Sequence, residues 1–481
     1  MLLNSFSFLW FFALVAVVYY SIPGRFRWVL LLVASYYFYS AFELAYLVLL
    51  AYATAAAYVF GRLVEDGSQN PRGKLWLGLG VLAQLSVLAV FKYADFLLES
   101  VESALAPFSL FQNALAIPRL GWLLPVGLSF FTFSCVSYII DCYRGKLRAE
   151  RHLGHLAVYV AFFPKLVAGP IERATSFLPQ LREGATFDPV RVAFGLQLLL
   201  WGLFKKVVIA DRLAEFVDAG FTNTAFQSPV TVLISVYFYA FQIYCDFSGY
   251  SDMAIGLAAI LGFTLIENFR RPYLSRNIAE FWSKRWHISL ANWFRDYLYI
   301  PLGGSRMSRP RFYLNVMAVF AVSGLWHGAS WTFVIWGAIN GFYQVIWLML
   351  AGLRQRLAAV IPGALWTAIS VLLTFHLIVF AWVFFRAATL SGAIAIFDRV
   401  WSALSLYPSL LRTYNWTPEF WLSLTLIVVL MIVECFDEVR SIFHRIAALP
   451  LLPRWGLYYS MIACLLVIGR WSGAEFVYMQ F

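Results

Sequence analysis

The chain has 481 residues, of which 62% are hydrophobic and 19% aromatic, while only 13% are charged. An ordinary soluble domain carries roughly 25% charged residues, so these proportions exclude a soluble globular protein, a coiled coil and a disordered chain. The net charge of +11 comes from 36 Lys and Arg against 25 Asp and Glu. Basic residues orient membrane helices, so this excess predicts lipid surroundings and no nucleic-acid partner.

Apolar runs long enough to cross a hydrocarbon layer of ~30 Å recur along the chain, roughly ten to twelve in number. The first run, MLLNSFSFLWFFALVAVVYY, has no basic segment before it and no cleavage site after it, so we predict a membrane helix and not a signal peptide. The predicted fold is an all-α polytopic membrane protein, with a single domain over residues 1–481. Within it we separate N-terminal helices (1–120), a core (121–350) and C-terminal helices with an aromatic tail (351–481).

Basic residues are concentrated in alternate loops and predict which side of the membrane each loop faces. Six basic loops are predicted to be cytoplasmic, and they lie at residues 25–27, 62–74, 144–151, 306–311, 354–356 and 440–454. The loops around residue 43 and at 99–119 are poor in basic residues and are predicted to face outward. Both chain termini are then predicted on the outer, periplasmic side.

Two segments do not fit a simple membrane span. Residues 153–170, ending in FFPKLVAGP, are apolar but carry a lysine and two prolines, which favours a re-entrant segment buried in protein. Residues 276–300 combine Trp282, Trp286, Trp293 and Phe294 with Lys284, Arg285 and Arg295. This segment is too charged to span and too aromatic to be solvated, so we expect it at the cytoplasmic interface or lining a cavity there.

His327, in the run SGLWHGASW, is the first candidate catalytic residue. It lies about 15 residues beyond the basic loop that ends at Arg311, a helical reach of ~24 Å, which places it deep in the membrane. Gly324, Gly328 and Ala329 let backbone or a ligand approach it closely. A deep imidazole could remove a proton from a hydroxyl that attacks a thioester. The alternative is a neutral histidine satisfied by a carbonyl.

His287 is the second candidate, and its neighbours suggest binding of an anionic cofactor. Lys284, Arg285 and Arg295 could bind the phosphates of a nucleotide, and Trp286 could stack on its ring. Plain membrane anchoring explains the same residues equally well.

Asp246 and Asp252 lie within the apolar run YCDFSGYSDMAIG. Carboxylates at membrane depth need partners, and the candidates are Arg270, Arg271, Lys205 and Lys206. We favour a structural ion-pair role over catalysis. A metal site is not expected because no His, Cys or Asp cluster has ligand spacing, and the five cysteines contain no CxxC pair.

Several motifs together resemble one known family. The runs FFPKLVAGPIERA, QIYCDFSGYSDMAIGLAAILGF, NFRRPYLSRNIAEFWSKRWHISLANWFRDYLYIPLGG and SGLWHGASWTFVIWGAINGFYQ look like the bacterial branch of the membrane-bound O-acyltransferase family that contains the alginate O-acetyltransferases. The resemblance spans at least residues 124–347. It implies a ring of helices around a thin centre, where a cytoplasmic funnel for the acyl donor meets an outer opening for the acceptor.

The resemblance also implies roles for the two histidines. The catalytic histidine of the family falls on His327, and its second histidine falls on His287. The donor would be acetyl-CoA, with no tightly bound cofactor, and acetyl would pass through periplasmic partner proteins to an exported polysaccharide at the bacterial inner membrane. Relatives that acetylate cellulose or peptidoglycan, or that move D-alanine, share these motifs.

The C-terminal run Glu475-Phe-Val-Tyr-Met-Gln-Phe481 resembles the aromatic C-terminal motif of the small partner protein in the D-alanyl transfer system. Tyr478 carries its only hydroxyl, and a phenol near pKa 10 is a better leaving group than a sugar hydroxyl. We therefore expect that Tyr478 carries the acetyl group, with an interfacial anchor as the alternative.

Two other classes of protein remain to be weighed. A glycan transporter or flippase predicts inverted halves with broken helices, and the sequence has no such internal repeat. A scaffold in an export complex would not require a histidine at depth. Release of CoA from acetyl-CoA distinguishes the enzyme from both.

Overall fold

The computed structural model describes residues 1–65, 72–105, 119–122, 124–405, 414–439, 442–471 and 476–479. Within these ranges every regular element is helical, which confirms the predicted all-α class. The bounds of the helices are α1 (Phe6–Ser21), η1 (Gly24–Phe26), α2 (Arg27–Ser40), α3 (Tyr46–Val64), α4 (Gly73–Leu88), η2 (Ala89–Tyr93), α5 (Ala94–Leu105), α6 (Leu128–Tyr143), α7 (Leu153–Ala161), α8 (Phe163–Leu166), α9 (Ala174–Glu183), α10 (Pro189–Leu203), η4 (Phe204–Ala210), α11 (Asp211–Thr222), η5 (Thr224–Phe226), α12 (Pro229–Ile260), η6 (Pro272–Leu274), α13 (Ile278–Glu280), η7 (Phe281–Arg285), α14 (Ile288–Phe294), η8 (Arg295–Tyr299), η9 (Gly304–Arg306), α15 (Arg309–His327), α16 (Trp331–Met349), α17 (Ala351–Val360), α18 (Gly363–Arg386), α19 (Leu390–Ser405), α21 (Pro418–Val439), α22 (Ile442–Ala447), α23 (Leu451–Ile468) and η10 (Val477–Met479).

The membrane character of the chain is visible in the length and composition of these helices. Over the described ranges, eight helices are long and apolar enough to cross a bilayer, and two shorter apolar helices, α1 and α6, accompany them. The chain is therefore a multi-pass membrane protein. The order of α1, α2, α3, the continuous α4–η2–α5 rod and α6 matches the five N-terminal runs that hydropathy predicts.

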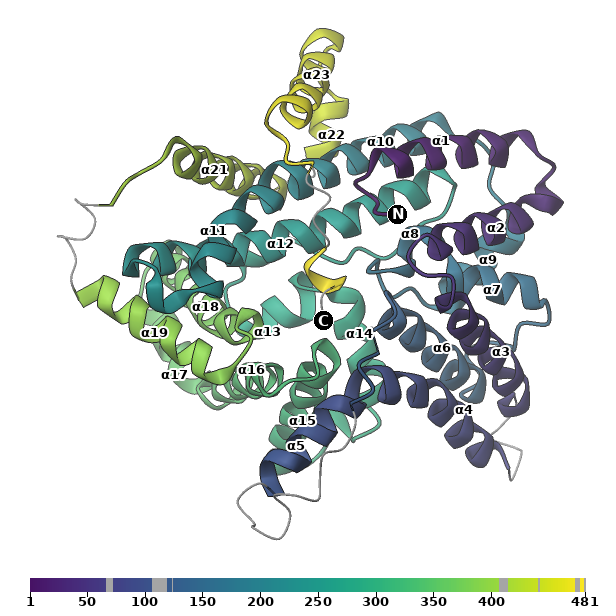
Figure 1. Cartoon of the computed structure of the whole chain (residues 1–481), viewed down its shortest axis with the longest axis horizontal. Coiled ribbons are helices and arrows are strands. Elements are labelled where there is room, and N and C mark those ends of the chain that lie inside the picture. The colour runs from purple at the N-terminus through teal and green to yellow at the C-terminus, as the bar shows by residue number, and fades with distance from the viewer. Residues whose placement is uncertain are drawn as a thin grey trace.

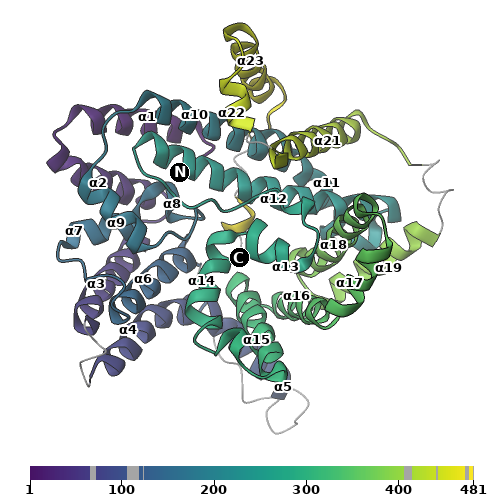
Figure 2. The ribbon, with the colours of Figure 1, turned by 180° about the vertical axis from the view of Figure 1, so that it is seen from behind.

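The helices are arranged around a centre in which the C-terminal segment lies. Both ribbon views show α3, α4 and α6 on one flank and α16, α18 and α19 on the other, with α12 running between them (Figures 1 and 2). The short η10 element lies near the middle of this ring, whereas α23 projects away from the body (Figure 1). Within the C-terminal region, η10 is therefore enclosed by other helices, whereas α23 stands outside the ring (Figure 1).

Helix α12 forms the central element of the core because its sequence starts it sharply and buries most of its length. The Ser228 hydroxyl accepts a hydrogen bond from the Thr231 N–H at 3.1 Å, and Pro229 occupies the first turn, where no N–H is needed. The helix then runs for 32 residues and packs along α10 and α11. Its buried polar side chains include Asp246.

The two segments predicted to break the membrane pattern are both irregular, and the first is largely buried while the second is buried in part. Residues 153–170 form the short helices α7 and α8 on either side of Phe162, and residues 156–170 are buried. Residues 276–300 are divided into the short elements α13, η7, α14 and η8, in which Trp286, Trp293 and Phe294 are buried. Irregular backbone at such depth is tolerated where protein encloses it, as it does here.

Candidate active site

His327 is the last residue of α15 and is held there by close helix packing. A Cβ atom at Gly324 would lie 2.4 Å from the Phe333 carbonyl oxygen of α16, so only glycine allows the two backbones to approach this closely. The imidazole is 4% exposed and packs against Trp336 and Phe385, with ring centroids 4.8 and 5.5 Å away. His327 is thus buried and Gly324 allows the close backbone approach that was predicted, whereas the depth of His327 in the membrane stays a prediction.

The hydrogen bonding of His327 fixes which ring nitrogen is available for chemistry. Its Nδ1 lies 2.6 Å from the Ser323 carbonyl oxygen, one turn earlier on α15. A carbonyl oxygen can only accept, so Nδ1 carries the hydrogen. Nε2 therefore keeps its lone pair, which is the state that a general base requires.

His287 is held in a strained backbone conformation by a buried amide. Its φ of 47° is left-handed, which is uncommon for a residue with a side chain. Its Nδ1 donates to the Asn268 Oδ1 at 3.0 Å, and the same oxygen accepts from the Ser289 hydroxyl at 2.8 Å. The Nε2 of His287 is buried and has no hydrogen-bond partner in the described part of the chain.

The structure brings the two histidines together on either side of Trp326. The centroid of the Trp326 ring lies 4.8 Å from that of His327 and 6.0 Å from that of His287. Both rings line cavity 1, a volume of about 290 Å³. The other residues that line cavity 1 are Ala279, Trp282, Ser283, Trp286, Leu290, Ala291, Asn292, Phe294, Arg295, Tyr299, Phe312, Val316, Val319, Phe320, Ser323, Gln344 and Leu348.

A second, smaller volume lies beyond the C-terminal end of α15. Cavity 2 measures about 30 Å³, and His327 lines it as well as cavity 1. The other residues lining cavity 2 are Lys92, Leu124, Pro125, Val126, Gly127, Leu128, Ser129, Phe130, Trp326 and Tyr478. His327 thus stands where two separate volumes meet.

Lys92 lies in the π-helical segment η2, lines cavity 2 and contacts the end of α15. Its ammonium donates to the main-chain carbonyl oxygens of Trp326 at 2.6 Å and His327 at 3.1 Å. Carbonyls at a helix C-terminus carry partial negative charge, so the cation stabilises the turn that presents His327. Sequence reasoning missed this residue; a lone lysine in the apolar run VLAVFKYADF was the available signal.

The aromatic tail reaches into this site. Of the run 475–481, residues 476–479 are described, and the ring of Tyr478 lies 5.9 Å from that of His327 and 6.3 Å from that of His287, centroid to centroid. Its closest ring neighbour is Phe247 of α12, at 3.9 Å. The Tyr478 hydroxyl is buried without a hydrogen-bond partner of ordinary geometry among the described residues. The phenol ring therefore lies beside both histidines.

The residues predicted to bind a nucleotide occupy different positions. Lys284 is exposed, and Arg295 is 56% exposed at the edge of cavity 1, next to Asp296. Trp286 is buried among Tyr244, Phe269, Phe281 and Trp382, so it is not a surface anchor, although one side of it lines cavity 1. Arg295 pairs with Asp296 at 2.8 Å, but its guanidinium and the Lys284 ammonium are both exposed enough to reach a phosphate.

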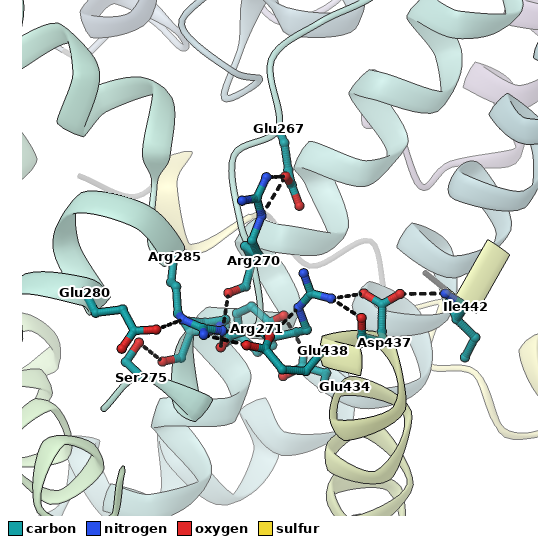
Figure 3. Close-up of polar contacts among 12 residues, drawn as sticks. Glu267, Arg270, Arg271, Ser275, Glu280, Arg285, Glu434, Asp437, Glu438 and Ile442 are labelled. Carbon is teal, nitrogen blue, oxygen red and sulfur yellow. Dashed lines mark hydrogen bonds and ion pairs between the residues drawn. The ribbon is translucent and has the colours of Figure 1, made fainter. Parts of the chain in front are cut away.

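Arg285 is held by carboxylates, as Figure 3 shows. Its guanidinium contacts Glu280 at 2.7 Å and Glu438 of α21 at 2.6 Å. Neighbouring Arg271 contacts the same Glu438 and also Asp437. These pairs tie η7 to α21, so the expectation of phosphate binding passes from Arg285 to Lys284 and Arg295.

Asp246 and Asp252 form the ion pairs that their depth requires. Lys205 contacts Asp252 at 2.8 Å, and Lys206 contacts Asp246 at 2.6 Å. The lysine partners are therefore confirmed, whereas Arg270 and Arg271 pair with other carboxylates. In the described ranges no cluster of three His, Cys, Asp or Glu side chains has the arrangement of a metal site.

Comparison with known proteins places this site in a family. Residues 31–389 match the model of the membrane-bound O-acyltransferase family. A probable alginate O-acetylase of Pseudomonas aeruginosa is 38% identical over 449 residues, covering 92% of this chain and 83% of that protein. A peptidoglycan O-acetyltransferase of Helicobacter pylori is 36% identical, covering 76% and 72%. A teichoic acid D-alanyltransferase of Bacillus subtilis is 27% identical, covering 54% and 68%.

Proposed function

The chain belongs to the membrane-bound O-acyltransferase family, and on this premise we propose that it transfers acetyl from cytoplasmic acetyl-CoA to an exported polysaccharide of the alginate type. It is an acyltransferase, and its relatives include a probable alginate O-acetylase and a peptidoglycan O-acetyltransferase. The observation that carries the proposal is the position of His327, which lines cavity 1 and cavity 2 at once. A thioester on one side and an acceptor on the other would both reach one base.

The charge pattern supports an orientation for the two cavities. Cavity 1 extends along α15 from Phe312, next to the basic loop at residues 306–311. The positive-inside rule assigns that loop to the cytoplasm, where acetyl-CoA is made available to the enzyme. Cavity 2 is lined by residues 124–130, which follow the loop at 99–119 predicted to face outward. The acetyl group would then cross the bacterial inner membrane, while the large CoA stays in the cytoplasm.

The lining of cavity 1 favours acetyl over D-alanyl as the transferred group. None of its described lining residues is Asp or Glu, and Arg295 is its one permanently charged side chain. A D-alanyl group carries an ammonium ion, which would be desolvated here without a carboxylate partner. A neutral acetyl group avoids this penalty, and Arg295 with Lys284 suits the anionic phosphates of CoA.

In the first chemical step, Tyr478 serves as the acyl carrier. The Nε2 of His327 takes the phenol proton while the phenol oxygen attacks the thioester carbonyl carbon. The carbon–sulfur bond then breaks, and the thiolate takes the proton back from the imidazolium to leave as CoA thiol. Acetylated Tyr478 and neutral His327 remain. His287, which lines the same cavity, would orient the acyl donor by accepting a hydrogen bond from it at Nε2.

In the second step, a hydroxyl of a periplasmic partner protein attacks the acetyl-tyrosine ester. His327 takes the proton of the attacking hydroxyl and returns it to the ester oxygen of Tyr478 as the carbon–oxygen bond to tyrosine breaks, so the tyrosine is regenerated for the next cycle. A phenolic ester is activated relative to a sugar ester because the phenol is the better leaving group. The partner would then place acetyl on the polysaccharide.

Purified protein tests this function directly. With acetyl-CoA and no acceptor, we expect release of CoA thiol up to one equivalent of enzyme and a single added acetyl on the C-terminal peptide by mass spectrometry. A flippase or an export scaffold releases none. A deletion strain identifies the glycan. We expect the acetyl content of the exported polymer to fall and the acetyl content of the peptidoglycan to stay unchanged.

A further inference from the structure

Asp246 divides its buried carboxylate between a cation and the tail of the chain. Its Oδ1 accepts from the ammonium of Lys206 at 2.6 Å. Its Oδ2 accepts from the backbone N–H of Val477 at 2.7 Å. The Asp246 side chain is only 3% exposed, so both hydrogen bonds are made away from water. A structural ion pair alone explains the first contact but not the second.

Lys206 extends the same contact to a second residue of the tail. It also pairs with Asp211 at 2.8 Å, and its ammonium lies 4.4 Å from the centroid of the Phe476 ring. That ring packs edge-on against Tyr250 of α12 at 4.7 Å. Lys206 belongs to the π-helical segment η4, and local π-helical turns are frequent at functional sites. The two residues before Tyr478 are thus held by η4 and α12.

Consecutive residues of α12 hold consecutive residues of the tail. Asp246 accepts from the N–H of Val477, and the ring of the next residue, Phe247, lies 3.9 Å from that of Tyr478. A main-chain N–H in an apolar interior is costly without an acceptor, and a carboxylate is the strongest one available. This arrangement fixes the tail in a single register, and that register puts the phenol beside His327.

We propose that Asp246 and Lys206 are positioning residues for acyl transfer: the ion pair docks the tail through Val477 and Phe476 and thereby delivers Tyr478 to His327. This inference rests on the proposed function, in which Tyr478 receives the acetyl group. It assigns to two of the intramembrane charges a task in the reaction, although neither touches the reacting atoms. Asp211 completes the pairing of the cation.

The test removes the backbone N–H that the tail donates to Asp246 and leaves the Asp246–Lys206 ion pair intact. Val477→Pro deletes the N–H that Asp246 accepts, and proline suits this position because Val477 is the first residue of the helical turn η10. Val477→Ala keeps the N–H and is the matched control. Each full-length protein is placed in bacterial phospholipid nanodiscs, and deuterium exchange of the peptide after Trp471 is measured together with acetyl transfer.

For Val477→Pro we expect fast exchange of the tail peptide and a fall in acetyl transfer of about 100-fold, the loss typical of a misplaced reacting group. The KM for acetyl-CoA should not change, because cavity 1 is untouched. Val477→Ala should keep the tail protected and transfer well above the proline variant. A proline variant with wild-type transfer overturns the positioning role, whether or not its tail exchanges. Full transfer by Tyr478→Phe would instead overturn the carrier step of the proposed function, so the two failures are distinguishable.

Discussion

The imidazole of His327 and the phenol ring of Tyr478 lie 5.9 Å apart between centroids, although one ends α15 and the other belongs to η10, the last helical turn that the structure describes. The ring planes are inclined at 62°, and the Tyr478 hydroxyl is buried. This neighbourhood explains how a deep base and a distant C-terminal hydroxyl could act in one reaction.

Replacing His327 by alanine should abolish acetyl transfer while leaving the protein folded. Loss of a general base typically costs 10²- to 10⁴-fold, so release of CoA thiol should fall by at least about 100-fold. As controls, the variant should insert into the membrane and remain monodisperse in detergent, as the wild-type protein does. A folded variant that keeps more than about a tenth of the activity would exclude the catalytic role.

Tyr478→Phe should bind acetyl-CoA normally and deliver no acetyl to polymer. The phenylalanine ring preserves the contacts with Phe247 and the histidines and removes only the nucleophilic oxygen. Mass spectrometry should show acetyl on the wild-type C-terminal peptide and none on the variant. If polymer acetylation is unchanged, the tail serves as an anchor only.

Lys92→Met should lower acetyl transfer through its effect on the end of α15. The variant loses two hydrogen bonds from a cation to the Trp326 and His327 carbonyl oxygens, each worth roughly 1.5–3 kcal/mol. We expect a loss of roughly tenfold or more in kcat with little change in the KM for acetyl-CoA. Lys74→Met removes an exposed positive charge from the same rod of helix and is the control. Equal rates for the two variants would contradict the role assigned to Lys92.

Arg295 and Arg285 should respond differently to substitution by alanine. Arg295→Ala, like Lys284→Ala, should raise the KM for acetyl-CoA several-fold with kcat retained, since phosphate contacts exist in ground and transition states alike. Arg285→Ala leaves Glu280 without its cation and leaves Glu438 with Arg271 alone, so it should lower the melting temperature. A short thioester without a nucleotide provides the control. If Arg295 binds phosphate, Arg295→Ala must raise the KM for acetyl-CoA more than the KM for the short thioester.

The sequence by itself determined the membrane class, the helical fold and the burial of His327. These properties are local: hydropathy predicts each apolar helix, glycine spacing predicts close packing at Gly324, and chain length from a basic loop predicts the depth of His327. The lysine partners of Asp246 and Asp252 were also within reach, because a buried carboxylate requires a cation and few are available at that depth. The nucleotide contacts were ambiguous because basic and aromatic residues serve anchoring and binding equally.

Only the tertiary structure decided which of these residues meet. Lys92 supports His327 from a segment far away in the chain, Asn268 holds His287 from 19 residues earlier, and Arg285 pairs with Glu438 of α21. The tail enters the centre because Asp246 has a second lone-pair direction that a backbone N–H can fill. Contacts of this kind depend on the relative placement of whole helices. That placement follows from packing and ion pairing over the entire fold, so no local sequence pattern encodes it.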